Sequence, residues 1–279
     1  MDTTSTTLLD AQENRAAKIY SAMEHLWIEG TVAELRVPNA TLTERSDYTT
    51  TMVGYFDNLD DLVIAATQWS GRAPGVYWTI NPINPAFLSV AKNRVLRARA
   101  NLVKDTDILR RSTLLIDIDP YRHPKDISAT DVEKAHARDV LGITVYHLTV
   151  LGWPEPILVD SGNGYYALYR IDEPTNDNGL VKRVLKTLDQ LFTTPDAKID
   201  TSVFNPARIA KVIGTKACKG EDDKETGRPH RYGTIISTPA VWSVVPRECL
   251  ESLVRTYITS ARKLLTNRSY GVSYHLCSG

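Results

Sequence analysis

Apolar positions along the chain follow two repeats, one typical of helices and one typical of strands. A spacing of three to four residues predicts helices over 11–29, 58–70, 130–151, 177–192 and 246–265. Alternation predicts strands over 31–37, 49–56, 75–81, 112–120 and 231–238, and a strand, turn and strand over 156–171. Residues 197–215 also read as extended. Residues 1–10 are expected to fray, and Gly30 to end the first helix.

Two helix starts carry recognisable caps. Asn58 can cap the second predicted helix, and Ser128 or Thr130 the third, with Glu133 placed three residues after Thr130 as in a capping box.

The order of these elements indicates the fold class. Strands and helices interleave, but several neighbouring strands are joined by turns rather than by helices. This pattern favours an α+β core with a mixed sheet over a purely parallel sheet. The length of 279 residues suits one or two domains, and we find no internal repeat or low-complexity linker.

Composition narrows the picture only slightly. Lysine plus arginine equals aspartate plus glutamate, 33 each, so no global field indicates a polyanionic partner. A local basic excess runs from Lys92 to Arg111 and could follow a nucleic-acid backbone or form a solvated helix face.

Cysteine spacing and hydropathy bear on the compartment. Cys218, Cys249 and Cys277 are far apart, which argues against structural zinc and against a disulfide framework. No apolar run reaches the length of a membrane span, and the N-terminus lacks a signal pattern. We therefore expect a cytoplasmic protein with no membrane partner.

The stretch DSGNGYYALYRI, Asp160 to Ile171, fits the loose pattern G-x-G-x-x-[GA]. A dinucleotide-binding turn needs a helix directly after the glycines, whereas YYALYRI alternates like a strand, so we reject that interpretation. Two interpretations stay open. The turn is a hairpin in which Asn163-Gly164 supplies positive φ, or its backbone N–H groups and Ser161 approach a phosphate closely.

Asp117 and Asp119 interrupt the apolar strand LLIDIDP. Because strand side chains alternate, both carboxylates project from the same face. Two adjacent like charges in a buried strand need a cation or a basic partner, and oxygen ligands at this spacing suit Mg²⁺ or Mn²⁺. The alternative is a solvated strand end whose aspartates cap a loop.

A third carboxylate, Asp200, ends the stretch KID and precedes a basic segment. Separated carboxylates and basic residues are the ingredients for holding a metal-bound triphosphate. The segment is not a Walker A loop, and EDDKE in its middle is equally typical of a solvated loop. His230 could equally be structural. The basic candidates are Arg208, Lys211, Lys216, Lys219, Arg228, His230 and Arg231.

Read in order, LLIDIDP, DSGNGYYALYRI and KIDTSVFNPARIAKVIGT resemble the archaeo-eukaryotic primase superfamily. The resemblance covers roughly residues 50–235 and is strongest to primase-polymerases of phages, plasmids and other mobile elements, some of them CRISPR-associated. It implies a catalytic core of two interleaved subdomains with an RRM-like sheet over residues 1–245. Helices would flank the core at both ends, with 246–279 as a C-terminal helical segment.

The resemblance also implies roles for the motif residues. Asp117, Asp119 and Asp200 would be catalytic and would hold two divalent ions, Mg²⁺ or Mn²⁺. The remaining candidates would contact the incoming nucleotide: Ser161, Gly162, Asn163, Gly164, Tyr166, Arg208, Lys211, Lys219, Arg228, His230 and Arg231. Tyr166 departs from the family, which has histidine there. A phenol can donate a hydrogen bond to a phosphate but cannot carry the histidine's positive charge.

The function implied is template-directed primer synthesis or extension. Its partners would be a DNA template and primer, dNTPs or NTPs, and a helicase domain or protein. Two alternatives remain open at this point: a nucleotide-binding or nucleic-acid-binding module in which Tyr166 marks lost catalysis, and a metal-dependent nuclease using the same carboxylates.

Overall fold

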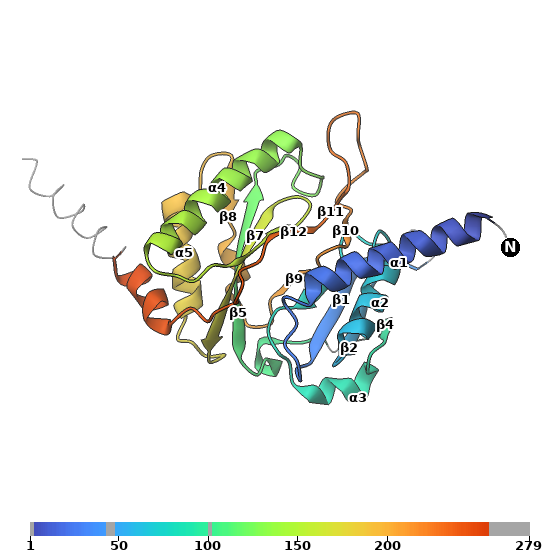
Figure 1. The fold of residues 1–279 in the computed structure, drawn as a ribbon, viewed down its shortest axis with the longest axis horizontal. Coiled ribbons are helices and arrows are strands. Elements are labelled where there is room, and N and C mark those ends of the chain that lie inside the picture. The colour runs from blue at the N-terminus through green and yellow to red at the C-terminus, as the bar shows by residue number, and fades with distance from the viewer. Residues whose placement is uncertain (1–2, 43–47, 100–101, 257–279) are drawn as a thin grey trace, which may run out of the picture.

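The computed structural model describes residues 3–42, 48–99 and 102–256. Within these ranges the chain forms two five-stranded sheets and a two-stranded ribbon, with helices packed against the sheets (Figure 1). The α+β class is confirmed. Pairing between the strands is antiparallel, and parallel pairing is confined to two isolated bridges, Tyr55–Lys92 and Arg170–Val244.

The first sheet has the strand order β4-β2-β1-β3-β9. Its strands are β1 (Ala33–Thr41), β2 (Thr49–Phe56), β3 (Tyr77–Thr79), β4 (Val95–Arg97) and β9 (Ile209–Lys211). Helices α1 (Thr3–Met23) and α2 (Leu59–Trp69) pack together, and α2 contacts β1 and β2. The cap expected at Asn58 is confirmed, since its side chain accepts a hydrogen bond from the Asp61 amide at 3.0 Å.

The second sheet has the order β12-β6-β7-β5-β8. Its strands are β5 (Arg111–Pro120), β6 (Ile157–Asp160), β7 (Tyr165–Glu173), β8 (Ala197–Ile199) and β12 (Thr234–Ser237). Helices α4 (Asp131–Val150) and α5 (Leu180–Phe192) pack on it, shown as the green and yellow helices of Figure 1. β10 (Lys216–Ala217) and β11 (Arg231–Tyr232) form the ribbon.

Short helical turns connect these elements. They are Pro85–Phe87, α3 (Leu88–Ala91), Asp105–Asp107 and Thr201–Phe204.

β5 owes its central position to its sequence. Leu114, Leu115, Ile116 and Ile118 are at most 3 % exposed, because β5 pairs with β7 on one side and with β8 on the other while α4 packs on the sheet. A nearly continuous apolar run is typical of a strand covered on both faces. The two aspartates of β5 therefore lie in a strand whose neighbours fix it firmly.

Several sequence predictions were wrong in detail. α1 begins at Thr3, within the residues expected to fray, and ends at Met23. Leu26 and Trp27 have helical spacing, but they lie in the turn after α1, where their amides donate to the Met23 carbonyl. Residues 231–238 form two strands in different sheets, and 201–204 form a 3₁₀ turn. Residues 92–111 form β4, a 3₁₀ turn, loops and the first residue of β5, so the proposed solvated helix face is absent from the described part of that segment.

The C-terminal segment joins the second sheet. Val244 bridges to Arg170, and the buried Leu250 and Leu253 belong to the main apolar core. A helix runs over 247–256, and the rest of the helix expected to reach 265 lies outside the described residues. The division at 245/246 stays a prediction. Among the described residues, no helix has the length and apolarity required to cross a membrane.

The capping box of α4 gives a direct test of the fold. The Thr130 hydroxyl accepts from the Glu133 amide at 3.2 Å, and Glu133 Oε2 accepts from the Thr130 amide at 2.8 Å. Thr130→Ala should lower the free energy of unfolding by about 1 kcal/mol in urea denaturation, because one orphan amide loses its acceptor. Thr130→Ser keeps the acceptor and serves as the control. Equal stability of the two variants would contradict the cap.

Candidate functional site

A pocket of about 230 Å³ opens between the two sheets, at the ends of β5 and of the β6–β7 hairpin. The second sheet contributes acidic and hydroxyl groups, and the first sheet contributes Tyr77, Ile209 and basic groups. Nine of the candidates from the sequence line it, namely Asp117, Asp119, Ser161, Asn163, Tyr166, Asp200, Arg208, Lys211 and Lys219. Residues that are up to 142 positions apart in the chain, Tyr77 and Lys219, thus converge on one pocket.

The carboxylates crowd one end of this pocket. Asp117 and Asp119 share a face of β5, and Asp200, just after β8, donates its amide to the Asp117 carbonyl at 2.8 Å. The pKa of Asp117 is raised well above its ordinary value, first by burial and then by the negative charges of Asp119 and Asp200, while Lys219 and Arg208 oppose the rise. Asp117 therefore interacts unfavourably with both of the other acidic groups.

Basic side chains line the same pocket. Lys211 is 4 % exposed, and burial together with repulsion by Lys219 lowers its pKa to about 8, although the charges of Asp117 and Asp119 partly counteract this. Arg208 is oriented by Asn205 and by the Ser202 carbonyl, at 3.0 and 2.8 Å. The pocket thus holds carboxylates and cations together, an arrangement suited to a phosphate group accompanied by a metal ion.

The β6–β7 turn is a tight four-residue loop. The Ser161 amide donates to the Gly164 carbonyl at 2.9 Å, and the Ser161 hydroxyl accepts from the Gly164 amide at 3.2 Å. The positive φ expected at Asn163-Gly164 lies instead at Gly162, with φ +94°. Gly164 is needed for a different reason, since a Cβ there would lie 2.5 Å from the Ile118 carbonyl oxygen. The hairpin therefore rests directly on the aspartate strand.

Asn163 fixes this turn to the start of α4. Its Oδ1 accepts from the Ala129 amide at 2.9 Å, and the residue is 4 % exposed. Its Nδ2 has no hydrogen-bond partner within the described structure, although the residue lines the pocket. An unsatisfied buried donor in this position can be satisfied by an acceptor that enters the pocket.

Tyr166 lies directly opposite Asp117 in the β5–β7 pairing. Burial, followed by the charges of Asp117 and of the neighbouring groups, raises its pKa well above the ordinary value, while a hydrogen bond with Ser161 opposes the rise. The phenol therefore stays protonated and can act as a hydrogen-bond donor. It stands where the resemblance places a histidine.

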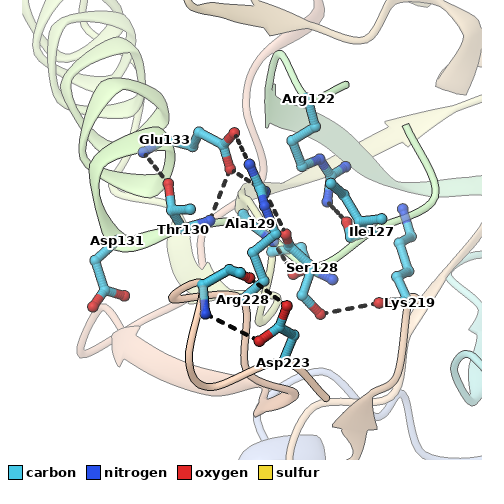
Figure 2. Close-up of polar contacts among 12 residues, drawn as sticks. Arg122, Ile127, Ser128, Ala129, Thr130, Asp131, Glu133, Lys219, Asp223 and Arg228 are labelled. Carbon is cyan, nitrogen blue, oxygen red and sulfur yellow. Dashed lines mark hydrogen bonds and ion pairs between the residues drawn. The ribbon is translucent and has the colours of Figure 1, made fainter. Parts of the chain in front are cut away.

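Five predicted contact residues do not line the pocket. Two are the hairpin glycines Gly162 and Gly164, and the other three have side chains that are engaged elsewhere. Arg228 donates to both carboxylate oxygens of Glu133, at 2.8 and 2.9 Å, and to the Ser128 carbonyl (Figure 2). Arg231 pairs with Asp131 at 2.7 Å, and His230 Nε2 lies 3.0 Å from the Gly220 carbonyl. These contacts hold the segment that carries Lys219 against the start of α4. Nucleotide contact by these three residues stays a prediction.

The segment also meets α4 through its backbone. The Ser128 hydroxyl donates to the Lys219 carbonyl at 3.1 Å (Figure 2). Lys216 is paired with Asp222 at 3.5 Å.

Sequence reasoning missed Tyr77 and Arg122. Tyr77 lines the pocket from β3, and burial, Asp117 and Asp119 raise its pKa. Arg122 is buried, lies 3.5 Å from Asp119, and donates to the Ile127 carbonyl at 3.2 Å (Figure 2). Its position three residues after Asp119 was the available signal. Tyr77 could not be found this way, because it comes from the other sheet.

Comparisons with known proteins give one distant likeness. No family model and no curated protein matches the chain. A crystal structure of primase RepB' matches with a TM-score of 0.47 and 12 % identity, over 92 % of this chain and 67 % of that one. A crystal structure of the catalytic domain of primase RepB' in complex with initiator DNA matches with a TM-score of 0.45 and 12 % identity, over 89 % and 97 %. Values this low carry no statement about function.

The contact between hairpin and aspartate strand predicts a sharp effect at Gly164. In Gly164→Ala, the new Cβ would collide with the Ile118 carbonyl and lie 3.0 Å from Asp119 Oδ1. We expect the free energy of unfolding to fall by about 1–3 kcal/mol, as measured by urea denaturation. Gly142→Ala is the matched control, because its Cβ meets nothing within 4 Å on helix α4. Equal stability of the two variants would show that the close approach is wrong.

Proposed function

We propose that this protein is a template-directed DNA primase-polymerase of the archaeo-eukaryotic primase superfamily. One observation carries the proposal: carboxylates from β5 and from the end of β8 share a pocket with Arg208, Lys211 and Lys219. A site for nucleotidyl transfer needs cations, because the triphosphate and the departing group are anionic, and it needs carboxylates to hold the divalent ions at the reacting phosphate. The three ordered sequence motifs support the same proposal.

The basic side chains would bind the triphosphate. Arg208, Lys211 and Lys219 would neutralise its phosphates, and Ser161 and the unsatisfied Asn163 amide would donate hydrogen bonds to phosphate oxygens. A volume of about 230 Å³ is below the roughly 300–1,000 Å³ of pockets that enclose a whole ligand. The base and sugar would therefore lie outside this pocket, against the template.

The reaction would join a primer to this nucleotide. The oxygen of the primer's 3′-hydroxyl would form a bond to the α-phosphorus as the bond to the β-phosphate breaks. Pyrophosphate would leave with the electron pair, and the hydroxyl proton would pass to solvent. The cationic side chains would stabilise the negative charge that grows on the departing pyrophosphate.

A divalent cation suits the chemistry of the donor set. Asp117, Asp119 and Asp200 offer hard oxygen donors, and their mutual repulsion is the charge that Mg²⁺ or Mn²⁺ would neutralise. Two such ions would supply Lewis acidity at the reacting phosphate. As the side chains stand, however, no three His, Cys, Asp or Glu groups among the described residues are arranged to hold a metal. The metal proposal therefore rests on charge and donor type.

DNA template and primer, dNTPs or NTPs, and a helicase partner belong to the same proposal. One observation favours a second candidate, a nucleotide-binding module without catalysis, because the carboxylates do not form a ready ligand set. Labelled-dNTP incorporation on a primed template with Mg²⁺ or Mn²⁺ separates the two. Nucleotide binding without incorporation supports the module, and metal-dependent degradation of DNA would indicate a nuclease.

Neutralising the aspartates should separate activity from stability. Asp117→Asn or Asp119→Asn should lower incorporation by about 1,000-fold or more, equivalent to roughly 4 kcal/mol of transition-state stabilisation. Their thermal unfolding midpoints should match or exceed that of the wild type, because like-charge repulsion is relieved. Asp139→Asn, on the exposed face of α4, is the control. Near-normal incorporation by either pocket variant would refute the proposal.

Tyr166 tests the hydrogen-bond donor of the hairpin. Tyr166→Phe removes only the hydroxyl, and we expect nucleotide affinity to fall by about tenfold, the value of roughly one hydrogen bond to a charged group. Tyr166→His should restore affinity if a donor at this position is what the site requires. Unchanged affinity in Tyr166→Phe, measured by nucleotide titration, would assign the tyrosine to packing.

A further inference from the structure

A second hollow lies behind the hairpin, away from the carboxylates. It has a volume of about 670 Å³ and is formed by α1 on one side and by residues 232–238 on the other. Its lining includes Arg15 and Lys18 of α1 and His25 of the turn that follows α1, with Tyr232, Thr234 and Thr238 opposite. From Arg15 to the end of α1 at Met23 the helix axis runs roughly 12 Å, at about 1.5 Å per residue.

The charge of this hollow has one sign. Three lining residues are basic or titratable to a cation, and among the described residues no carboxylate lines it. The basic groups are also available, since within the described ranges neither Lys18 nor His25 has an ion-pair partner. Arg228 and Arg231, by contrast, are already neutralised by Glu133 and Asp131. A polyanion would therefore find unpaired cations in the hollow but not at Arg228 and Arg231.

The wall opposite α1 adds an aromatic surface and hydroxyl groups. The Arg15 guanidinium lies 3.4 Å from the centre of the Tyr232 ring, and Tyr232 is 39 % exposed. Thr234 and Thr238 add hydroxyl donors on this wall, and Ser21 adds one from α1. Basic side chains interleaved with an exposed aromatic ring are the usual components of a surface for single-stranded nucleic acid.

The hollow and the candidate site share a wall. Thr234 pairs with Asp160 directly before the hairpin, and a Cβ on Gly162 would lie 3.2 Å from the Arg231 carbonyl oxygen. The Gly214 amide donates to the Gly233 carbonyl at 3.0 Å, which joins this wall to the strand that carries Lys211. A strand held in the hollow would therefore lie against residues that contact the hairpin.

We propose that this hollow binds the sugar-phosphate backbone of a single-stranded nucleic acid through Arg15, Lys18 and His25, with a base stacked at Tyr232. The identification of this strand as the template rests on the proposed function. The binding of a strand in the hollow does not, because none of the residues that line the hollow also lines the carboxylate pocket.

The test is fluorescence anisotropy with a labelled oligo(dT) of about 20 nucleotides, titrated at several salt concentrations. Arg15→Ala and Lys18→Ala should each lower the slope of log affinity against log salt by about 0.7, the contribution of one phosphate contact. At 0.1 M salt this corresponds to about fivefold weaker binding. Lys186→Ala, an exposed lysine on α5, is the matched control and should bind as the wild type does.

Two results would overturn the proposal. In the first, Arg15→Ala and Lys18→Ala both keep the wild-type oligonucleotide affinity and the wild-type salt slope. The other is normal oligonucleotide binding with loss of dTTP binding, which would make the hollow a mononucleotide site. Lys18 is exposed, so its variant remains informative even if Arg15→Ala is unstable by thermal melting. Asp117→Asn should bind oligo(dT) normally while losing synthesis. If the proposed function is wrong, the oligo(dT) affinities of the Arg15 and Lys18 variants therefore still test the hollow.

Discussion

The fold is organised around a concentration of negative charge, which basic groups from other parts of the chain offset only in part. Asp117, Asp119 and Asp200 lie close enough in a buried region to raise the pKa of Asp117 well above its ordinary value. Desolvated like charges are costly, and a strand that carries them must be held by its neighbours. β5 meets this condition because β7 and β8 flank it and α4 packs against the sheet.

The charge balance comes from the other sheet. Lys211 belongs to β9, and Arg208 directly precedes this strand, whereas the aspartates belong to the second sheet. Joining the two sheets therefore creates the pocket, and neither sheet contains it alone. The glycines of the hairpin serve this assembly by letting the turn rest on β5 and on Ala217 of the ribbon.

Local rules predicted much of this arrangement. Period-two alternation placed Asp117 and Asp119 on one face. Capping chemistry predicted Asn58 correctly and offered Thr130, the cap of α4, as one of two alternatives. Contacts between distant residues could not be predicted in this way. The sequence does not show that Arg228 pairs with Glu133, 95 positions earlier. A cation with an ion-pair partner therefore cannot be told from one without a partner by sequence. For the same reason the cations of α1 received no attention, since their significance depends on the residues opposite.

The pairing of Arg228 with Glu133 has a consequence for how such a protein can evolve. Replacing either residue alone would leave the half-buried charge of the other without its partner, so a single substitution at either position should destabilise the fold. Replacement should therefore occur in concert, and homologues should show the two positions changing together. The identity of Glu133, in the first turn of α4, would then depend on the loop that bears Lys219, although Glu133 does not line the candidate site.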